Sequence, residues 1–214
     1  REGQVEGDEQ KGGGIFISNA SPVFNNCIIS NNRTVVSSGG WARVGGGGVY
    51  ALDSNSIFNN VIFRGNEAHA TTSHSHDDAE SYGGALYIEN GNVQLINCSV
   101  ENNHIYGNDQ NNNGNSTAYI RGSGIYKSGG GTLTITDTQI HSNTISESGH
   151  NHNISGGGIY ANGATVNIIN STIANNLTKT GNSSTTALSG SGVYLDSWGR
   201  SEKAWFFNNI VWGN

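Results

Sequence analysis

Proline is nearly absent from this 214-residue chain, which has one, and charged residues make up only 12% of it. Methionine is absent and nothing resembles a signal peptide, so we expect a mature product or an excised piece of a longer chain. No apolar run approaches the roughly 20 residues that span a bilayer, so we expect no membrane insertion in this segment. The net charge of −6 leaves no basic stripe to neutralise phosphates, so nucleic acid is not an expected partner.

Glycine and asparagine are abundant instead. The chain has 32 glycines and 31 asparagines, and only 34% of its residues are hydrophobic. That hydrophobic fraction is low for a globular protein. It is compatible with a regular β architecture in which one face of each strand is buried.

Two short motifs recur six times along the chain. The first is glycine-rich and ends in an aliphatic and an aromatic residue: GGGIF (12–16), GGGVY (46–50), GGALY (83–87), GSGIY (122–126), GGGIY (156–160) and GSGVY (190–194). The second ends in an asparagine, here called the ladder Asn: Asn32, Asn66, Asn103, Asn143, Asn176 and Asn214. The aliphatic residue precedes the ladder Asn by 17 residues in four copies, and the full period runs from 34 to 39. Because the variable part follows the ladder Asn, each copy reads as a constant core plus a variable loop.

Apolar residues recur three and eight positions before each ladder Asn, and Asn or Asp recurs six positions before it. An alternation broken by Asn and Gly predicts short strands joined by turns, because both residues adopt left-handed backbone angles at little cost. Coils that repeat one strand order stack in register about 4.8 Å apart, so the ladder Asn amides can hydrogen-bond up the column. The glycines permit tight packing, and the aliphatic residues fill the interior.

The paired motifs, GG[AIL] and [FIV]xxN, resemble the repeats of polymorphic outer membrane proteins. More broadly, they resemble the parallel β-helix repeats of bacterial secreted and surface proteins, the pectin-lyase-like superfold. The resemblance covers residues 12–214, and residues 1–11 are expected to be a leader or the end of a preceding coil. It implies one all-β domain, a right-handed parallel β-helix of about six coils with long loops on one edge. One such fold hosts many chemistries, so the resemblance is specific for the fold and weak for function.

The two cysteines test this register. Cys27 and Cys98 both lie five positions before their ladder Asn, with Val61 in the coil between them. Two coils separate them by about 9.6 Å, whereas a disulfide needs Cα atoms within about 7 Å. We therefore predict two free thiols in one interior column, which indicates little about the compartment.

The aromatic residue of the first motif forms a column of its own. Its members are Phe16, Tyr50, Tyr87, Tyr126, Tyr160 and Tyr194. Because the neighbouring aliphatic residue should point inward, the aromatic residues should point outward, and an exposed aromatic row is a plausible platform for sugar rings. The alternative is that the rings stack on one another beneath covering loops.

Histidines gather in the variable segments. Loops 67–82 and 144–155 are expected on one edge, and His69 and His104 lie on that edge too. The candidate metal ligands are His74, His76, Asp77, Asp78, His150 and His152. His-x-His spacing offers two imidazoles to Zn²⁺, and the acidic residues with Glu80 would suit Ca²⁺. The alternative is that these residues merely belong to polar, exposed loops. No other cofactor is expected.

Catalysis is a further hypothesis. Pectin-lyase-like enzymes place Asp, Lys or Arg side chains, often with Ca²⁺, on one sheet, which makes Asp53, Glu89, Lys127 and Arg121 the fallback catalytic residues. Glycosidases need two carboxylates a few ångströms apart, and only Asp53 and Glu89 lie on neighbouring coils, offset by one position. Lys127 stands where other copies have a core residue, which indicates either a kinked strand or a base.

The sequence favours a non-catalytic role. Asn214 is itself a ladder Asn, and no polar cap is visible, so either coils continue or the open end stacks on a partner. We expect a secreted or cell-surface segment, an adhesin, stalk or filament rod, that contacts polysaccharide or cell-surface glycans through its loops and aromatic column. The alternatives are a polysaccharide lyase or glycoside hydrolase, and end-to-end self-assembly.

Overall fold

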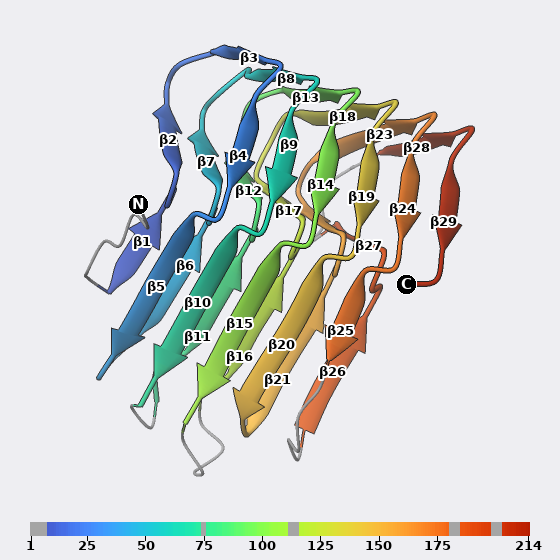
Figure 1. The fold of residues 1–214 in the computed structure, drawn as a ribbon. Helices are drawn as coiled ribbons and strands as arrows, with labels where there is room; N and C mark the ends of the chain where they lie inside the picture. The colour runs from blue at the N-terminus through green and yellow to red at the C-terminus, as the bar shows by residue number, and fades with distance from the viewer. Residues whose placement is uncertain (1–7, 74–75, 111–115, 180–184, 198–202) are drawn as a thin grey trace.

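The computed structural model describes residues 8–73, 76–110, 116–179, 185–197 and 203–214. These residues form 29 strands and no helix. The chain passes through five parallel sheets in turn, here called sheets I to V in chain order, and strands five apart in sequence lie side by side (Figure 1). The expected all-β parallel solenoid is confirmed.

Sheets II, III and IV enclose one part of each coil, here called the head. Sheet II holds β2 (Ile15–Ser18), β7 (Val49–Leu52), β12 (Leu86–Glu89), β17 (Ile125–Ser128), β22 (Ile159–Asn162) and β27 (Val193–Asp196). Sheet III holds β3 (Val23–Asn25), β8 (Ile57–Asn59), β13 (Val93–Ile96), β18 (Thr132–Thr136), β23 (Thr165–Ile169) and β28 (Ala204–Phe207). Sheet IV holds β4 (Ile28–Ser30), β9 (Ile62–Arg64), β14 (Ser99–Glu101), β19 (Gln139–His141), β24 (Thr172–Ala174) and β29 (Ile210–Trp212).

Sheets V and I pack against each other as a thin two-layered extension of the head, here called the blade (Figure 1). Sheet V holds β5 (Arg33–Ser38), β10 (Glu67–Thr72), β15 (His104–Asp109), β20 (Thr144–Gly149) and β25 (Leu177–Lys179). Sheet I holds β1 (Glu9–Lys11), β6 (Ala42–Gly45), β11 (Ala79–Tyr82), β16 (Ala118–Arg121), β21 (Asn151–Ser155) and β26 (Thr185–Ser189).

The repeat motifs stack in the register that the sequence indicates. The aliphatic residues of the glycine-rich motif are direct partners in sheet II, so Ile15 pairs with Val49 and Val49 pairs with Leu86. Each copy supplies one strand to sheets II, III and IV, whereas sheet V has five described strands. Because six copies are separated by five coil-to-coil steps, the solenoid makes about five turns rather than the six expected.

The ladder Asn column joins the head to the blade. Asn66, Asn103, Asn143 and Asn176 are fully buried. At Asn103, Oδ1 accepts from the backbone N–H and the Nδ2 of Asn66 at 2.9 and 3.0 Å. Its own Nδ2 donates to Asn143 Oδ1 at 2.9 Å and to the carbonyl oxygen of Phe63 at 3.0 Å. Every polar atom of the amide therefore has a partner, as a buried polar group requires.

The turns at the recurring Asn, Asp and Gly positions of the repeat use left-handed backbone angles. Six positions before the ladder Asn, φ lies between 49° and 56° at Asn26, Asn60, Asn97, Asp137, Asn170 and Asn208. The first glycine of the repeat motif does the same, with φ of 60° at Gly83, where a Cβ would overlap the carbonyl oxygen of Leu86. The prediction that Asn and Gly mark the turns is therefore confirmed, because these are the residues that reach this region most readily.

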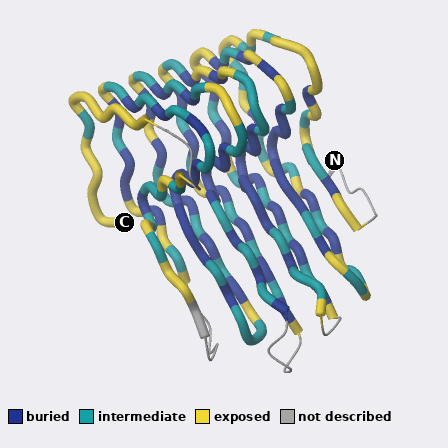
Figure 2. The backbone as a smooth tube through the Cα atoms, turned by 180° about the vertical axis from the view of Figure 1, so that it is seen from behind, coloured by how far each residue is buried: buried dark blue, intermediate teal, exposed yellow. Residues whose placement is uncertain are grey.

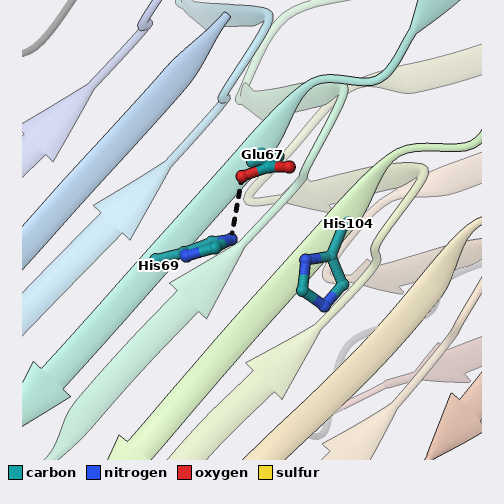
Figure 3. A group of neighbouring side chains, drawn as sticks. All are labelled: Glu67, His69 and His104. Carbon is teal, nitrogen blue, oxygen red and sulfur yellow. Dashed lines mark ion pairs between the residues drawn. The ribbon is translucent and has the colours of Figure 1, made fainter. Parts of the chain in front are cut away.

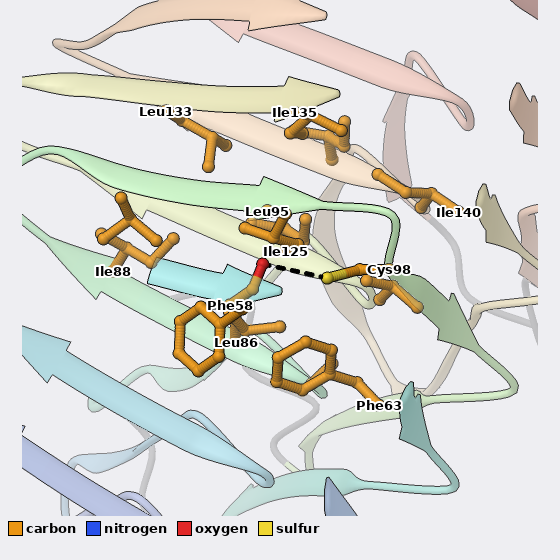
Figure 4. Packing of buried hydrophobic residues seen from close by; sticks show 14 of the residues in the cluster. Phe58, Phe63, Leu86, Ile88, Leu95, Cys98, Ile125, Leu133, Ile135 and Ile140 are labelled. Carbon is orange, nitrogen blue, oxygen red and sulfur yellow. Dashed lines mark hydrogen bonds between the residues drawn. The ribbon is translucent and has the colours of Figure 1, made fainter. Parts of the chain in front are cut away.

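The head is filled by large aliphatic and aromatic side chains. Phe58, Leu95 and Ile135 lie in one fully buried column of sheet III, and further apolar columns face them from sheets II and IV (Figure 4). Cys98 lies among them, with its Sγ 3.3 Å from the carbonyl oxygen of Phe58. Cys98 and the half-buried Cys27 are both free thiols, as the coil spacing predicts.

The blade replaces the loops expected on this edge. Residues 67–82 and 144–155 form strands over most of their length, and buried positions run along the blade (Figure 2). The inward residues of β10 are Ala68, Ala70 and Thr72, which are fully buried. Alanine and threonine add little to the hydrophobic alternation by which strands are recognised, so this period-2 pattern read as a polar loop. The expectation of long loops was wrong there.

Candidate functional site

The aromatic column runs along the outer face of sheet II, as its alternation with the buried aliphatic column predicts. Its rings lie one above another, with centroids 4.8 to 5.4 Å apart. Tyr87 meets both of its neighbours edge to face, whereas the other contacts in the column are stacked. The rings are those of Phe16, Tyr50, Tyr87, Tyr126, Tyr160 and Tyr194.

Most of these rings are closed to solvent. The exposed fraction is 1% for Tyr50, Tyr87 and Tyr160 and 5% for Tyr126. The backbone of sheet I lies directly against them, since a Cβ at Gly45 would overlap the Tyr87 ring. The expectation of an exposed row was therefore wrong at these four tyrosines. They stack beneath a cover, which is a neighbouring sheet rather than a set of loops.

Charged side chains complete this packed wall. Arg43 Nη2 donates to the Tyr87 hydroxyl at 2.9 Å, and its guanidinium carbon lies 5.4 Å from the centroid of the Tyr82 ring. Glu80 lies 3.3 Å from Arg43 Nε. Burial raises the pKa of Tyr87 and Tyr82 well above the ordinary value, so both phenols stay protonated and can donate. The Tyr87 hydroxyl and the Arg43 guanidinium therefore already have partners within the chain.

The aromatic column is more open to solvent at its two ends. Phe16 is 57% exposed in the first coil, and Tyr194 is half-buried in the last. Contact with a sugar ring through these two residues stays a prediction.

Two of the fallback catalytic residues are carboxylates, and a different neighbour holds each. The Tyr50 hydroxyl donates to Glu89, whereas Asn90 Nδ2 donates to Asp53 Oδ1 at 3.1 Å. Arg121 lies between aromatic rings, with its guanidinium carbon 5.1 Å from the Tyr160 centroid. These contacts hold together sheet II, its turns and the neighbouring strand β16.

Lys127, the fourth fallback residue, lies inside the head. Strand β17 is regular, and Lys127 stands in register with Ile88 and Ala161 at a fully buried, inward position. Its Nζ donates to the carbonyl oxygens of Ser128 at 2.9 Å and Gly130 at 2.8 Å. Burial lowers the pKa of the Lys127 amine to about 8. The kinked strand is wrong, and the amine points away from the outer faces where a polymer could lie.

Of the predicted metal ligands in the first loop, His76, Asp77 and Asp78 lie between β10 and β11, at the tip of the blade. His74 lies outside the described residues. His76 is exposed, while Asp77 and Asp78 are half-buried. Asp78 Oδ1 accepts the backbone N–H of Thr117, the neighbouring coil, at 2.8 Å.

The second predicted group lies two coils away. His150 is half-buried at the tip between β20 and β21, but His152 points into the blade, where its Nδ1 is 3.3 Å from Glu147 Oε2. Both of these side chains are fully buried. Strand β16 separates β11 from β21, which puts the two histidine groups about 9.6 Å apart. Among the described residues, the structure does not bring His150 and His152 into one site with His76, Asp77 or Asp78.

A third set of candidate metal ligands was not predicted from the sequence. Glu67, His69 and His104 lie together on the outer face of sheet V, and one ligand atom from each lies within 4.8 Å of the others (Figure 3). The sequence held the signal for it, because Glu67 and His104 each directly follow a ladder Asn and must therefore pair across neighbouring coils. We had assigned these residues to loops, for which no register can be predicted.

Comparisons with protein-family models, curated proteins and solved structures found no match to this chain. Within the part of the chain that the structure describes, no helix is long and apolar enough to cross a membrane. Function must therefore be argued from the geometry.

Proposed function

We propose that this chain is a non-catalytic, rod-forming segment of a secreted or cell-surface protein, an adhesin or stalk of the right-handed, pectin-lyase-like β-helix class. Its outer faces contact polysaccharide or cell-surface glycans. The alternative activity, a polysaccharide lyase or hydrolase, would need acid and base groups that reach a polymer.

The observation that carries the proposal is the packing of the outer face of sheet II. Glu89 projects from this face, Arg121 of β16 packs against its rings, and the aromatic side chains contact one another and sheet I. Parallel ladders continue through every coil, and an ordered amide column joins head to blade. Stacked ladders of this kind favour a stiff, extendable scaffold.

Exposed apolar residues in the two end coils favour end-to-end self-assembly. In the last coil, the core-column residues Phe206 and Val211 are 47% and 54% exposed, whereas their partners in the preceding coil, Ile168 and Ile173, are fully buried. In the first coil, the core residues Ile15 and Phe24 are only half-buried at the other end of the core. Because β4 and β29 are the two edges of one parallel sheet, one copy could pair β29 with β4 of the next and bury both apolar faces.

The role in glycan contact is tested by incubating the chain with fluorescent pectin, alginate and neutral glucans, with and without Ca²⁺, and measuring polymer size by exclusion chromatography. The proposal predicts unshortened polymer that co-elutes with the protein. Shortened polymer would establish catalysis and overturn the proposal. Unshortened polymer that elutes alone would contradict the glycan contact.

Self-assembly is tested by sedimentation over a range of protein concentrations. We expect association that Val211→Lys abolishes and that Gln139→Lys preserves. Gln139 is the control, because it is exposed on β19 of the same sheet but lies in a middle coil. A chain that stays monomeric at all concentrations, or equal effects of the two variants, would contradict end-to-end contact.

A further inference from the structure

Glu67, His69 and His104 converge from two neighbouring strands of the blade. Glu67 and His104 are direct partners across β10 and β15, and His69 stands two residues further along β10, so all three side chains leave the same face of sheet V (Figure 3). The rings of His69 and His104 meet edge to face, with centroids 5.2 Å apart. His69 Nε2 is 3.2 Å from Glu67 Oε2.

We propose that Glu67, His69 and His104 bind a divalent transition-metal ion of the Zn²⁺ type. Two imidazole nitrogens and one carboxylate oxygen are ligands that suit Zn²⁺, and water would complete a four-coordinate site. This site goes beyond the proposed rod function and does not depend on it.

The geometry is close to what such an ion needs but is not fully contracted. The candidate ligand atoms lie within 4.8 Å of one another, whereas bonds of 2.0–2.1 Å in a tetrahedron place ligands about 3.3 Å apart. The difference is within reach of side-chain rotation, because the backbone register already fixes the three Cα positions.

The ring of His104 is oriented by a neighbour on the next coil. His104 Nε2 is 2.6 Å from Ser146 Oγ, which leaves Nδ1 as its metal-binding nitrogen.

The guanidinium of Arg33 competes with a metal ion for two of the three proposed ligands. Its Nη2 lies 2.8 Å from His69 Nδ1, and its Nε lies 3.3 Å from Glu67 Oε2. When Nδ1 of His69 accepts from Arg33, the ring proton sits on Nε2, so metal binding at Nε2 must move that proton to Nδ1 and displace the guanidinium. The Arg33 side chain is 43% exposed and borders a hollow lined by Asn31 and Gly65, which gives it room to leave.

A matched control lies on sheet IV. There Glu101 accepts from Arg64 Nε at 2.5 Å and lies 3.3 Å from His141 Nε2. This group has the same carboxylate and guanidinium but a single imidazole, so we expect it not to bind the ion.

The experiment is calorimetric titration of the full chain with Zn²⁺ alone at neutral pH, with the visible spectrum of added Co²⁺ as a second readout. We expect one zinc site that His69→Ala and His104→Ala each weaken about 10-fold or more, with Glu67→Gln as a near-isosteric third variant. Arg33→Gln should strengthen binding several-fold, and His141→Ala should leave it unchanged. Cobalt should give the intense bands of four-coordination in the wild type and lose them in His104→Ala.

The loop histidines supply the competing outcome. Zinc binding that survives His69→Ala/His104→Ala and is lost in His74→Ala/His76→Ala would assign the ion to the blade tip and overturn the proposal. Absence of zinc binding in the wild-type chain, or weaker binding in Arg33→Gln, would overturn it as well. None of these results depends on glycan contact or on self-assembly.

Discussion

The head and the blade are built from the same parallel ladders but from different side chains. The head buries leucine, isoleucine and phenylalanine in a continuous core, whereas the blade core is mainly alanine, valine and isoleucine. Alanine burial contributes little hydrophobic free energy, so the blade depends more on its hydrogen-bonded ladders and less on apolar packing.

Buried ionisable groups also distinguish the two regions. The blade encloses the Glu147–His152 pair, and the ladder Asn column at its base is wholly polar. The head encloses one amine, Lys127, which reaches back to turn carbonyls. The constant part of the repeat thus specifies a stable scaffold, while the variable part carries the groups with chemistry, the histidines above all.

The largest effect is expected where the two regions join. Asn103→Ala removes the acceptor of the Asn66 amide and backbone N–H, and leaves the Phe63 carbonyl without its donor. Because each buried unpaired group costs about 1–3 kcal/mol, the unfolding free energy measured in urea should fall by about 4 kcal/mol. The control is Asn92→Ala, an exposed amide bonded to Asn55, which should cost less than about 1 kcal/mol. Equal losses would contradict the role assigned to the buried column.

Next comes the buried pair in the blade. His152→Ala leaves the Glu147 carboxylate without its partner imidazole, at a cost of about 3 kcal/mol. The double variant Glu147→Val/His152→Ala restores the types of residue that other coils have at these positions, Val36 and Ala118. Urea unfolding should show the double variant to be more stable than the single one. A double variant that loses the sum of two single losses would show that the pair is not coupled.

Lys127 offers a smaller effect of opposite sign in the head. Lys127→Leu should raise the unfolding free energy by about 1–2 kcal/mol, because an apolar side chain replaces a desolvated amine among Ile88 and Ala161. In the wild type the pKa of Lys127 falls from 10.5 to about 8 on folding, so the unfolded chain binds the proton more tightly. Stability should therefore rise between pH 8 and 10.5, and Lys127→Leu should remove that rise.

The smallest effect concerns acid and the outer face of the blade. The pKa of His69 falls from 6.5 to about 3 on folding, so the unfolded chain takes up a proton that the folded chain refuses. Stability should decline as the pH falls from 6.5 towards 3, and His69→Gln should reduce that decline. A pH profile that is unchanged in His69→Gln would contradict the assignment.

The sequence predicted the head well because its motifs repeat at constant spacing. The inward columns, the ladder Asn and the left-handed turns all follow from a fixed distance to one asparagine, and Cys27 and Cys98 could be placed by the same count. The blade was missed because Ala68 and Ala70 are inward residues of low hydrophobicity in segments of variable length. The burial of the tyrosines could not be predicted either. Tyr87 is covered by Arg43 and by the backbone of sheet I, whose strands had been assigned to loops.

The most direct test of the two-core account is native-state hydrogen exchange at the amides of one coil. The account predicts that the head strands β12, β13 and β14 exchange only through global unfolding. It predicts that β15 and β16 of the blade exchange through a partial opening that is about 1–2 kcal/mol less costly. Equal opening free energies throughout the coil, or a blade that outlasts the head, would contradict the account.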